Sequence, residues 1–576
     1  MTDFHFSPRP NRAAEIAWHP WDAQTFERAA REDKPVLLAI SAVWCHWCHV
    51  MDETTYSDQE VIAAINERYV AVRVDNDERP DVNARYNMGG WPTTAFLTPD
   101  GTLLTGATYL PPENMQRALS EVAAFYTERK HDIEAKEREI RGARTPYEIA
   151  PPEQLAPPLV DEYATALREG YDEEFGGFNE VPKFPQPEAH AFALAYWRLS
   201  NDARFYELVA HSLRAMAHGG MYDEVEGGFF RYSTTRDWSI PHFEKMADDH
   251  AGLLRVLAQL QLWAPSDLVR ADLEKTLGYV RTVLRDPQTG FFAGSQDADE
   301  EYYALPREER EKRTAPFVDR RSYSNWTAAL AGAFAWCGIA LEDDALIAES
   351  LATLDAMHER LRDSDGLLYH VLAPGEAPRV RGLLGDQVSY VRALLDAYEI
   401  SGEARMLERA RVHADATIAA FGAREGGFYD RADRETLGRL ELPDRPIGEN
   451  GLMAENLVRL AALLHEARYR ESAERTLLLY ANTFHRAMTF AASYVRALAR
   501  YLAPEIAVRI TGPLAAAASL RRAARRLSSP FVTVASENGG AAPAAYLCVG
   551  TTCAAPVASA DELERAYDGL NSAWKR

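Results

Sequence analysis

A pair of cysteines directly behind a short apolar run is the feature that most restricts how this chain can fold. Residues 35–41, Pro-Val-Leu-Leu-Ala-Ile-Ser, have the length and flanks of a buried strand, and Cys45-His46-Trp47-Cys48 follows at once. In such a strand-then-helix arrangement the first cysteine lies at a helix N-terminus, where unpaired N–H groups and the helix dipole favour a thiolate. The second cysteine, one turn along, can resolve a mixed disulfide. The motif therefore predicts thiol chemistry.

The elements around this pair follow in the order of a thioredoxin-like fold. The sequence predicts a helix over 59–68, a strand over 69–74, a strand over 93–97, a turn at 99–101 and a long charged helix over 111–141. Pro92 stands just before the second of these strands. In folds of this kind a cis-proline at about this place faces the cysteine pair and grips an extended substrate, although most X–Pro bonds are trans and the pattern alone leaves the isomer open. We predict a thioredoxin-like domain over 1–141, with Cys45, Cys48 and Pro92 at its catalytic site.

The alternative for the cysteine pair is half of a zinc site, completed by His46 or His49. A structural zinc ion takes four ligands, and no second cysteine pair stands nearby in the sequence. We therefore favour redox chemistry and predict no metal and no cofactor. A histidine between the cysteines stabilises the thiolate, which favours a more oxidising couple.

The composition of the chain restricts which classes of partner and which cellular compartment we expect. The chain has 576 residues, 47% of them hydrophobic and 26% charged, and a formal net charge of -23. So acidic a surface disfavours phosphate backbones and anionic lipids, and we expect neither nucleic acid nor membrane as a partner. No uninterrupted apolar stretch of about eighteen residues predicts a membrane span, and the first twenty residues or so lack the apolar core of a signal peptide. Only five cysteines occur, which favours a reducing cytoplasm over a disulfide framework.

The larger part of the chain reads as paired helices. A Pro-rich seam over 142–157 forms the predicted linker. Beyond it, glycine-aromatic units recur between stretches with apolar residues at helical spacing. Twelve helices are predicted, starting near residues 158, 187, 201, 243, 266, 324, 342, 385, 402, 447, 469 and 489. Six helical hairpins that each bury one face against their neighbours predict a closed (α/α)6 toroid over 158–503. The glycine-aromatic units are expected to have a structural role, with glycine supplying a positive φ and the aromatic ring closing the end of the core.

The tail changes character and predicts a small α/β appendage over 504–576. Strands are expected over 506–510, 531–534 and 545–548, with helices between and after them. Cys548 and Cys553 form a CxxxxC motif here. They are either a second redox pair or two buried thiols, and the sequence does not decide between these alternatives.

Polar side chains gather in three segments that are predicted to lie on loops or at helix starts within the toroid. Carboxylates with aromatic partners suit a sugar, because two carboxyl groups can share acid and base work and aromatic faces stack on sugar rings. The candidates for acid and base are Asp223, Glu244, Asp297 and Asp299. The candidates for orienting a hydroxylated or anionic ligand are Lys183, Tyr222, Arg231 and His242. The alternative is a salt-bridge network that closes the ring, and for Glu244 and Lys245 it is a pair of solvent-facing charges on a helix.

Several motifs together resemble one known family. They stand in this order: Cys45 to Met51, Asp77 to Asp81, Gly89 to Pro92, Phe96 to Gly101, Pro182 to Pro185, Arg231 to Ser233, Pro241 to Met246, Gln296 to Asp299, and Ala545 to Cys548 through Cys553 to Pro556. In them the chain is similar to the spermatogenesis-associated thioredoxin-domain family, whose bacterial members include YyaL-type proteins. The resemblance implies a thioredoxin-like domain fused to a six-hairpin-glycosidase-like barrel, a shape shared with sugar 2-epimerases and several glycosidases. It implies an architecture rather than an activity, because one fold hosts many reactions.

Three functions are consistent with this sequence. The first is a thiol–disulfide redox protein whose barrel binds a client or a small hydroxylated ligand, with a disulfide-bearing protein or a thioredoxin-system reductant as partner. The second is a carbohydrate-active barrel with epimerase- or glycosidase-like chemistry and a regulatory thioredoxin-like domain. The third is a non-catalytic scaffold. The first is favoured because a cysteine pair in this setting has few other uses.

Overall fold

The computed structural model divides the chain into two compact units, which are described separately below. It describes residues 4–143, 154–179, 181–433, 437–537, 539 and 542–574. One unit comprises residues 1–150 and 433–444, and the other comprises 151–432 and 445–576. Most of the predicted linker and Glu180, in one of the polar segments, lie outside the described residues. In the described residues no helix is long and apolar enough to cross a membrane.

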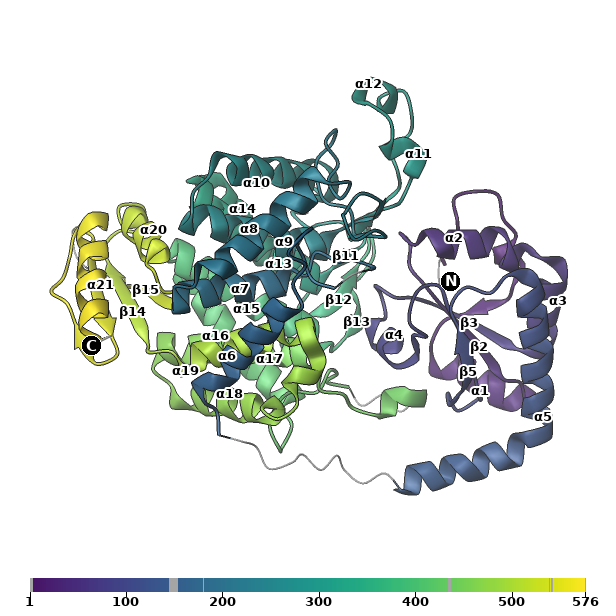
Figure 1. Cartoon of the computed structure of the whole chain (residues 1–576). Helices are drawn as coiled ribbons and strands as arrows, with labels where there is room; N and C mark the ends of the chain where they lie inside the picture. The colour runs from purple at the N-terminus through teal and green to yellow at the C-terminus, as the bar shows by residue number, and fades with distance from the viewer. Residues whose placement is uncertain are drawn as a thin grey trace. The chain divides into compact units, whose positions relative to one another are not determined.

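The N-terminal unit is a five-stranded sheet covered by helices (Figure 1). The strands are β1 (Trp18–His19), β2 (Val36–Ser41), β3 (Val70–Asp75), β4 (Thr93–Leu97) and β5 (Leu103–Ala107), in the order β1-β3-β2-β4-β5. The helices are α1 (Ala23–Glu32), α2 (His46–Glu53), α3 (Gln59–Arg68), α4 (Pro80–Tyr86) and α5 (Pro112–Ala143). Strands β1, β3 and β2 run parallel, whereas β4 and β5 are antiparallel to their neighbours. The thioredoxin-like fold is thus confirmed, and β1, α1 and α4 add to the elements predicted.

A segment that is distant in sequence completes this unit. The short helix η4 (Gly438–Glu441) lies inside the range predicted for the barrel but packs against the thioredoxin-like core. Leu440 is buried with apolar side chains of the sheet and of α1 and α4. The Tyr86 hydroxyl accepts a hydrogen bond from the Arg439 N–H (2.7 Å) and donates one to the Gly101 carbonyl (2.6 Å). We call residues 437–442 the strap.

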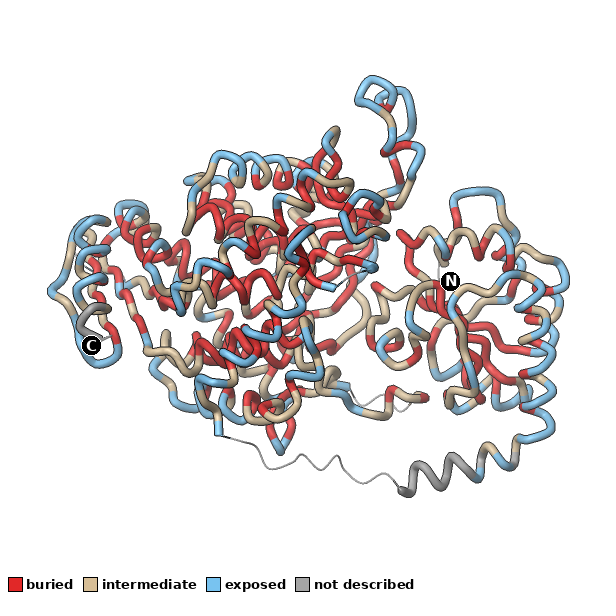
Figure 2. The backbone as a smooth tube through the Cα atoms, viewed as in Figure 1, coloured by how far each residue is buried: buried red, intermediate tan, exposed pale blue. Residues whose placement is uncertain are grey.

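The second unit contains the predicted toroid of paired helices. The inner helices are α7 (Pro187–Ser200), α9 (Ala247–Trp263), α13 (Ser324–Leu341), α15 (Leu384–Ser401), α17 (Ile447–Leu464) and α19 (Ala492–Leu502). Each contacts the next, and α19 contacts α7, so the ring closes. The outer helices are α6 (Pro157–Glu169), α8 (Ala203–His218), α10 (Asp267–Tyr279), α14 (Asp344–Arg360), α16 (Ala404–Phe421) and α18 (Ala467–Tyr480). Buried residues follow the inner helices, as Figure 2 shows. The (α/α)6 architecture is confirmed.

The glycine-aromatic units are turns anchored to the helix that follows them. Tyr222 pairs with Phe229 across one such turn, and Arg285 with Phe292 across another. The fourth residue of the next inner helix then accepts the N–H of the turn: His250 Nε2 from Phe229 (3.0 Å), Gln387 Oε1 from Leu368 (2.9 Å) and Asn450 Oδ1 from Phe428 (2.7 Å). The structure therefore supports a structural role for these units.

The loops that precede the inner helices carry short strands and two short helices. The strands are β6 (Tyr232–Ser233), β7 (Pro241–His242), β8 (Lys245–Met246), β9 (Ser295–Gln296), β10 (Val318–Asp319), β11 (Ser322–Tyr323), β12 (Tyr369–Leu372) and β13 (Arg379–Arg381). The short helices are α11 (Glu300–Tyr303) and α12 (Arg307–Arg310). These strands form small sheets, among them β10-β9-β8. They position the polar residues at the N-terminal ends of the inner helices.

The C-terminal appendage is a four-stranded sheet with two helices. Its elements are β14 (Ile506–Thr511), α20 (Ala518–Arg526), β15 (Val532–Glu537), β16 (Ala544–Val549), β17 (Thr552–Cys553) and α21 (Ala560–Trp574). Cys548 and Cys553 face each other across β16 and β17 and form a disulfide. The alternative of two buried thiols is wrong, because the edge strand β17 leaves Cys553 exposed.

Candidate functional site

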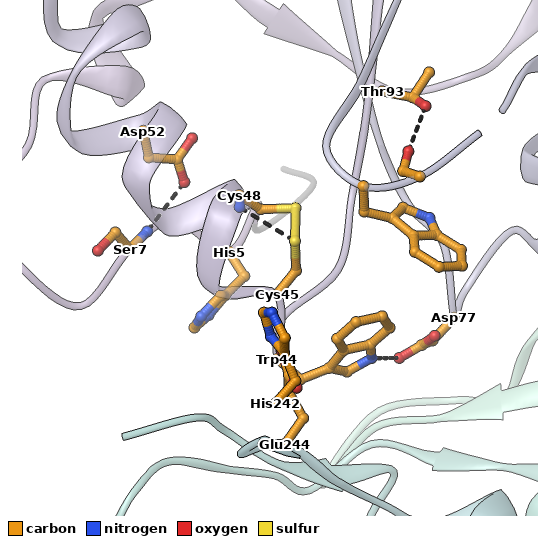
Figure 3. The surroundings of a disulfide bond; sticks show 12 residues. His5, Ser7, Trp44, Cys45, Cys48, Asp52, Asp77, Thr93, His242 and Glu244 are labelled. Carbon is orange, nitrogen blue, oxygen red and sulfur yellow. Dashed lines mark hydrogen bonds and ion pairs between the residues drawn. A yellow bond between two sulfur atoms is a disulfide. The ribbon is translucent and has the colours of Figure 1, made fainter. Parts of the chain in front are cut away.

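The cysteine pair lies at the start of α2, directly after β2. Cys45 is the N-cap residue of the helix, and its Sγ accepts the N–H of Cys48 at 3.1 Å. The two cysteines are joined by a disulfide (Figure 3). The sulfur of Cys45 thus occupies the place where helix N–H groups and the helix dipole stabilise negative charge. This geometry suits a nucleophilic thiolate in the reduced state.

Two tryptophans bring the loop with Pro92 beside the cysteine pair. The Trp44 Nε1–H donates to Asp77 Oδ2 at 2.7 Å, which fixes the residue before Cys45 (Figure 3). The rings of Trp44 and Trp91 meet edge to face with centroids 5.7 Å apart. Ile40, near the end of β2, pairs with Thr93, the first residue of β4. Pro92, whose peptide bond with Trp91 is cis, therefore lies next to the end of the strand that leads to Cys45.

A buried ion pair connects α2 to the sheet. Arg73 of β3 donates to both carboxylate oxygens of Asp52, each at 2.9 Å, and both side chains are buried. Asp52 Oδ2 also accepts the backbone N–H of Ser7 at 3.1 Å. Breaking a buried pair leaves one charge unsatisfied, so these contacts hold α2 firmly to the sheet. The sequence reasoning did not find this pair, because its members are 21 positions apart with no shared motif.

The histidines beside the cysteines do not form a recognisable metal site. Among the described residues, no group of three or more His, Cys, Asp or Glu side chains is placed to hold a metal ion. Burial, reinforced by the nearby His5, lowers the pKa of His49 to about 4. A neutral imidazole there is consistent with a packing role at neutral pH.

In the toroid, the predicted residues Asp223 and Lys183 are each held in a buried ion pair. Lys245 donates to Asp223 Oδ2 at 2.7 Å, and Arg310 donates to the same oxygen at 2.8 Å. Burial alone would raise the pKa of Asp223, but Lys245 and Arg310 together hold it below its usual range. Burial lowers the pKa of Lys245 to about 8 despite the carboxylate. The alternative of solvent-facing charges at 244 and 245 is wrong, since Lys245 lies on β8 and both side chains are buried.

Lys183 repeats this arrangement one hairpin earlier. Its ammonium donates to Asp172 Oδ2 at 2.6 Å and to the Arg236 carbonyl at 2.9 Å. Arg236 also pairs with Asp172. These contacts are those of the salt-bridge network that the sequence left open as an alternative.

The remaining predicted residues differ in what they contact. Tyr222 is buried and packs edge to face on Phe229, at a centroid distance of 4.8 Å. Asp299 is the N-cap of α11, where its Oδ1 accepts the Tyr302 N–H at 2.9 Å. Asp297 is buried just after β9, with Oδ1 accepting the Ala298 N–H at 2.8 Å. Tyr222 and Asp299 thus have structural contacts that account for them.

A polar cluster does form at the N-terminal end of α9. His242 stacks on Tyr232 with centroids 4.5 Å apart, and its Nδ1 lies 3.5 Å from Glu244 Oε1. Glu244 is buried, and its Oε2 has no hydrogen-bond partner. Asp248 and Asp249 occupy the first turn of α9. Desolvation by the surrounding protein and then the charge of Asp248 raise the pKa of Asp249, and Arg231 opposes this shift. Asp248 itself is exposed, and Asp249 is half-buried.

Asp248 and Asp249 were not among the residues predicted for a site, and neither was a second polar pair. His370 of β12 lies 2.8 Å from Asp386, which is in the first turn of α15. The Asp386 carboxylate also accepts the Asn325 N–H at 3.0 Å. A signal was present, because each acidic residue falls in the first turn of an inner helix, where negative charge is favourable.

Comparisons with known proteins match the N-terminal domain and, separately, about half of the chain. Residues 9–143 match the family model Thioredox_DsbH, described as a protein of unknown function, DUF255. Spermatogenesis-associated protein 20 of Homo sapiens is 35% identical over 307 residues, which is 49% of this chain and 39% of that protein. The thiol:disulfide interchange protein DsbD of Campylobacter jejuni is 32% identical over 68 residues, or 11% of this chain and 12% of that protein.

Among solved structures, cellobiose 2-epimerase from Bacillus thermoamylovorans B4167 aligns with a TM-score of 0.45 and 12% identity, over 56% of this chain and 86% of that one. The chain spans less than half the length of the spermatogenesis-associated relatives it matches. The resemblance inferred from the motifs is confirmed to this extent: the chain is similar to spermatogenesis-associated protein 20 over about half of its own length, and its N-terminal domain matches the thioredoxin-like DsbH (DUF255) model.

Proposed function

We propose that this protein is a thiol–disulfide redox protein that acts through Cys45 and Cys48. The observation that carries the proposal is the position of Cys45 as the N-cap of α2, with its sulfur accepting a helix N–H. The contact between Trp44 and Trp91, with Pro92 beside it, supplies a wall against which an extended client can lie. We propose a reducing cytoplasm as its compartment, as the small number of cysteines suggests.

The reaction balances as a two-electron exchange. The Cys45 thiolate attacks a client disulfide, forms a mixed disulfide and releases one client thiolate, which takes up a proton. The Cys48 thiolate then attacks Cys45 Sγ and releases the second client thiol. The client is reduced and the Cys45–Cys48 disulfide is formed. A dithiol reductant of the thioredoxin-system type restores the pair.

The test is the reduction potential of the Cys45–Cys48 pair. The protein is equilibrated with glutathione buffers in a Cys548→Ser/Cys553→Ser background, which removes the second disulfide, and is then alkylated and analysed by mass spectrometry. We expect one two-electron transition between about -270 and -120 mV, the range of working thiol oxidoreductases. Cys337 is the internal control, because burial raises the pKa of its thiol and it should alkylate slowly.

Single variants separate the two roles. Cys48→Ser should accumulate a mixed disulfide on Cys45 with a model disulfide substrate, whereas Cys45→Ser should accumulate none, since Cys48 is inside the first turn of α2. The absence of a disulfide at any glutathione ratio would contradict the proposal and leave the pair as a structural feature.

The cluster at the start of α9 supports a second candidate, a carbohydrate-active barrel. Asp249, whose pKa is raised well above its usual range, suits a general acid, and Asp248 or Glu244 suits the complementary base. A ligand with hydroxyl groups would also satisfy the unpartnered Glu244 Oε2. Thermal-shift measurement against a broad sugar panel tests this candidate. A stabilising sugar whose effect is lost in Asp249→Asn supports it, and no shift with any sugar contradicts it.

A further inference from the structure

The axis of the toroid holds a buried cluster of charges that the thiol chemistry does not use. Six arginines meet there: Arg255 of α9, Arg392 of α15, Arg459 of α17, Arg496 and Arg500 of α19, and Arg525 of α20. Their carboxylate partners are Glu188, Asp396, Glu399 and Glu455. Six cations against four anions leave this described cluster with two surplus positive charges.

The surplus positive charge is concentrated at the arginine that is farthest from a carboxylate. Arg459 is well paired, because it donates to Asp396 Oδ1 at 2.9 Å and to Glu399. Arg500 is not, since its Nη1 lies 3.9 Å from Glu455 Oε1 and its Nη2 lies 3.5 Å from Thr533 Oγ1. A charge-assisted hydrogen bond to a carboxylate is normally about 2.7–2.9 Å long. Arg500 is only 9% exposed, so bulk water does little to solvate the charge.

An unsatisfied donor lies in the same place. Arg525 Nε is buried and makes no hydrogen bond, and Arg496, which is paired with Glu455 (Nη2 to Oε2, 2.9 Å), lines the same cavity; both arginines are less than a tenth exposed. With Arg500 they line a cavity of about 40 Å³. A single water needs roughly 10–15 Å³, so this cavity has room for a small tetrahedral ion but not for a sugar ring or a nucleoside.

Two pKa values agree with a deficit of negative charge. Burial, and then the neighbouring Arg459, lowers the pKa of Arg500 to about 10. Burial, and then Arg392, lowers the pKa of Arg255 to about 10. Arg255 is paired with Asp396, but Arg500 has no carboxylate at hydrogen-bonding distance. A buried cation with so little compensation is costly unless an anion joins it.

We propose that this cavity binds a small dianionic oxyanion, inorganic phosphate or sulfate, which neutralises the two surplus charges and accepts hydrogen bonds from Arg496, Arg500 and Arg525. The bound anion links α19 of the toroid to α20 of the appendage. It is a structural ligand and is independent of the thiol chemistry at Cys45.

The first test is calorimetric titration of the full chain with phosphate at pH 8, after exhaustive dialysis into a chloride buffer. We expect one site, competition by sulfate, and a rise in the unfolding midpoint that sodium chloride of equal ionic strength does not produce. Acid release followed by a phosphate assay shows whether the ion was carried through purification. No bound phosphate, no titration heat and no shift would overturn the proposal. Tighter binding of a sugar phosphate than of phosphate would overturn the assignment to a free ion.

The second test compares the phosphate affinity of a variant that removes a positive charge with that of a variant that removes a negative charge. Arg500→Gln should weaken phosphate binding by about tenfold or more, whereas Glu455→Gln should tighten it, because one removes a cation and the other an anion. Arg526→Gln is the control, since Arg526 follows Arg525 on α20 but pairs with Glu342 at the surface. Loss of packing alone would not shift affinity in opposite directions. If Arg500→Gln fails to fold, Glu455→Gln decides, and unchanged affinity there overturns the site.

Discussion

At the scale of single residues, hydrogen-bond partners decide which polar groups are free to react. Asp223 and Lys183 carry charges suited to a ligand site, but each is already paired inside the protein. Glu244 and Asp249 keep the unmet acceptor and the raised pKa that such a site needs. The same residue types thus serve either packing or chemistry, depending on what surrounds them.

His250 gives a prediction about pH at this scale. Its Nδ1 contacts the Met246 carbonyl and its Nε2 accepts the Phe229 N–H, so the imidazole must be neutral. Burial lowers its pKa from 6.5 to about 4. Below about pH 6.5 the unfolded chain therefore binds a proton at this histidine that the folded chain does not bind. The free energy of unfolding should fall as the pH drops from about 6.5 towards 4, and this one group should account for up to about 3 kcal/mol of the loss.

The measurement is urea unfolding of the wild type and of His250→Gln between pH 4.5 and 8. Glutamine can accept the turn N–H as Gln387 does but does not titrate. The stability difference between the two proteins should shrink or reverse as the pH falls. His485→Gln, at an exposed position, is the control. Parallel pH curves for wild type and His250→Gln would contradict the assignment.

At the scale of elements, the repeated turns explain why the inner helices stay in register. Three of the glycine-aromatic turns donate an N–H to the side chain of the fourth residue of the following inner helix, which is His250, Gln387 or Asn450. The turn thereby fixes the rotation of that helix about its own axis. The acceptor is a histidine, a glutamine or an asparagine in the three cases. The sequence repeat is therefore visible in the glycines of the turns but not in the helix residues that bind them.

Two glycines of these turns should differ in their tolerance of alanine. Gly228 and Gly290 both have positive φ, 85° and 75°, so alanine is strained at each. A Cβ at 228 would lie 2.6 Å from Tyr279 Cδ1 and 2.8 Å from His250 Nε2, whereas a Cβ at 290 would lie 3.7 Å from Thr353 Oγ1. We expect Gly228→Ala to cost about 3 kcal/mol and Gly290→Ala about 1 kcal/mol. Equal losses in denaturant unfolding would contradict the packing argument.

At the scale of the whole molecule, the strap ties two distant parts of the chain into one core. Residues 437–442 follow the last glycine-aromatic turn in sequence but belong to the thioredoxin-like unit. Arg85 donates to the Leu442 carbonyl at 2.9 Å, and Leu440 is buried in the core. The N-terminal unit therefore depends on a segment supplied by the toroid part of the chain.

Leu440→Ala should loosen the thioredoxin-like unit by about 2–3 kcal/mol, because it deletes a buried side chain. Hydrogen exchange measured by mass spectrometry should show faster exchange in peptides covering residues 80–104, with the helices of the toroid unchanged. Leu268→Ala, at an exposed position on α10, is the matched control. Unchanged protection over 80–104 would mean that the strap adds nothing to this core.

The order of the elements could be predicted from the sequence, because helix and strand periods, glycine turns and the cysteine pair are local signals. The sequence predicted β4 and α3 to the residue and the helices of the toroid to within a few positions. Which charges pair depends on tertiary packing alone, since Asp223 meets Lys245 from 22 positions away and Arg310 from 87 positions away. Tertiary packing also decided the strap and the arginine cluster, because burial and net charge at a point in space depend on many helices at once and leave no pattern along the chain.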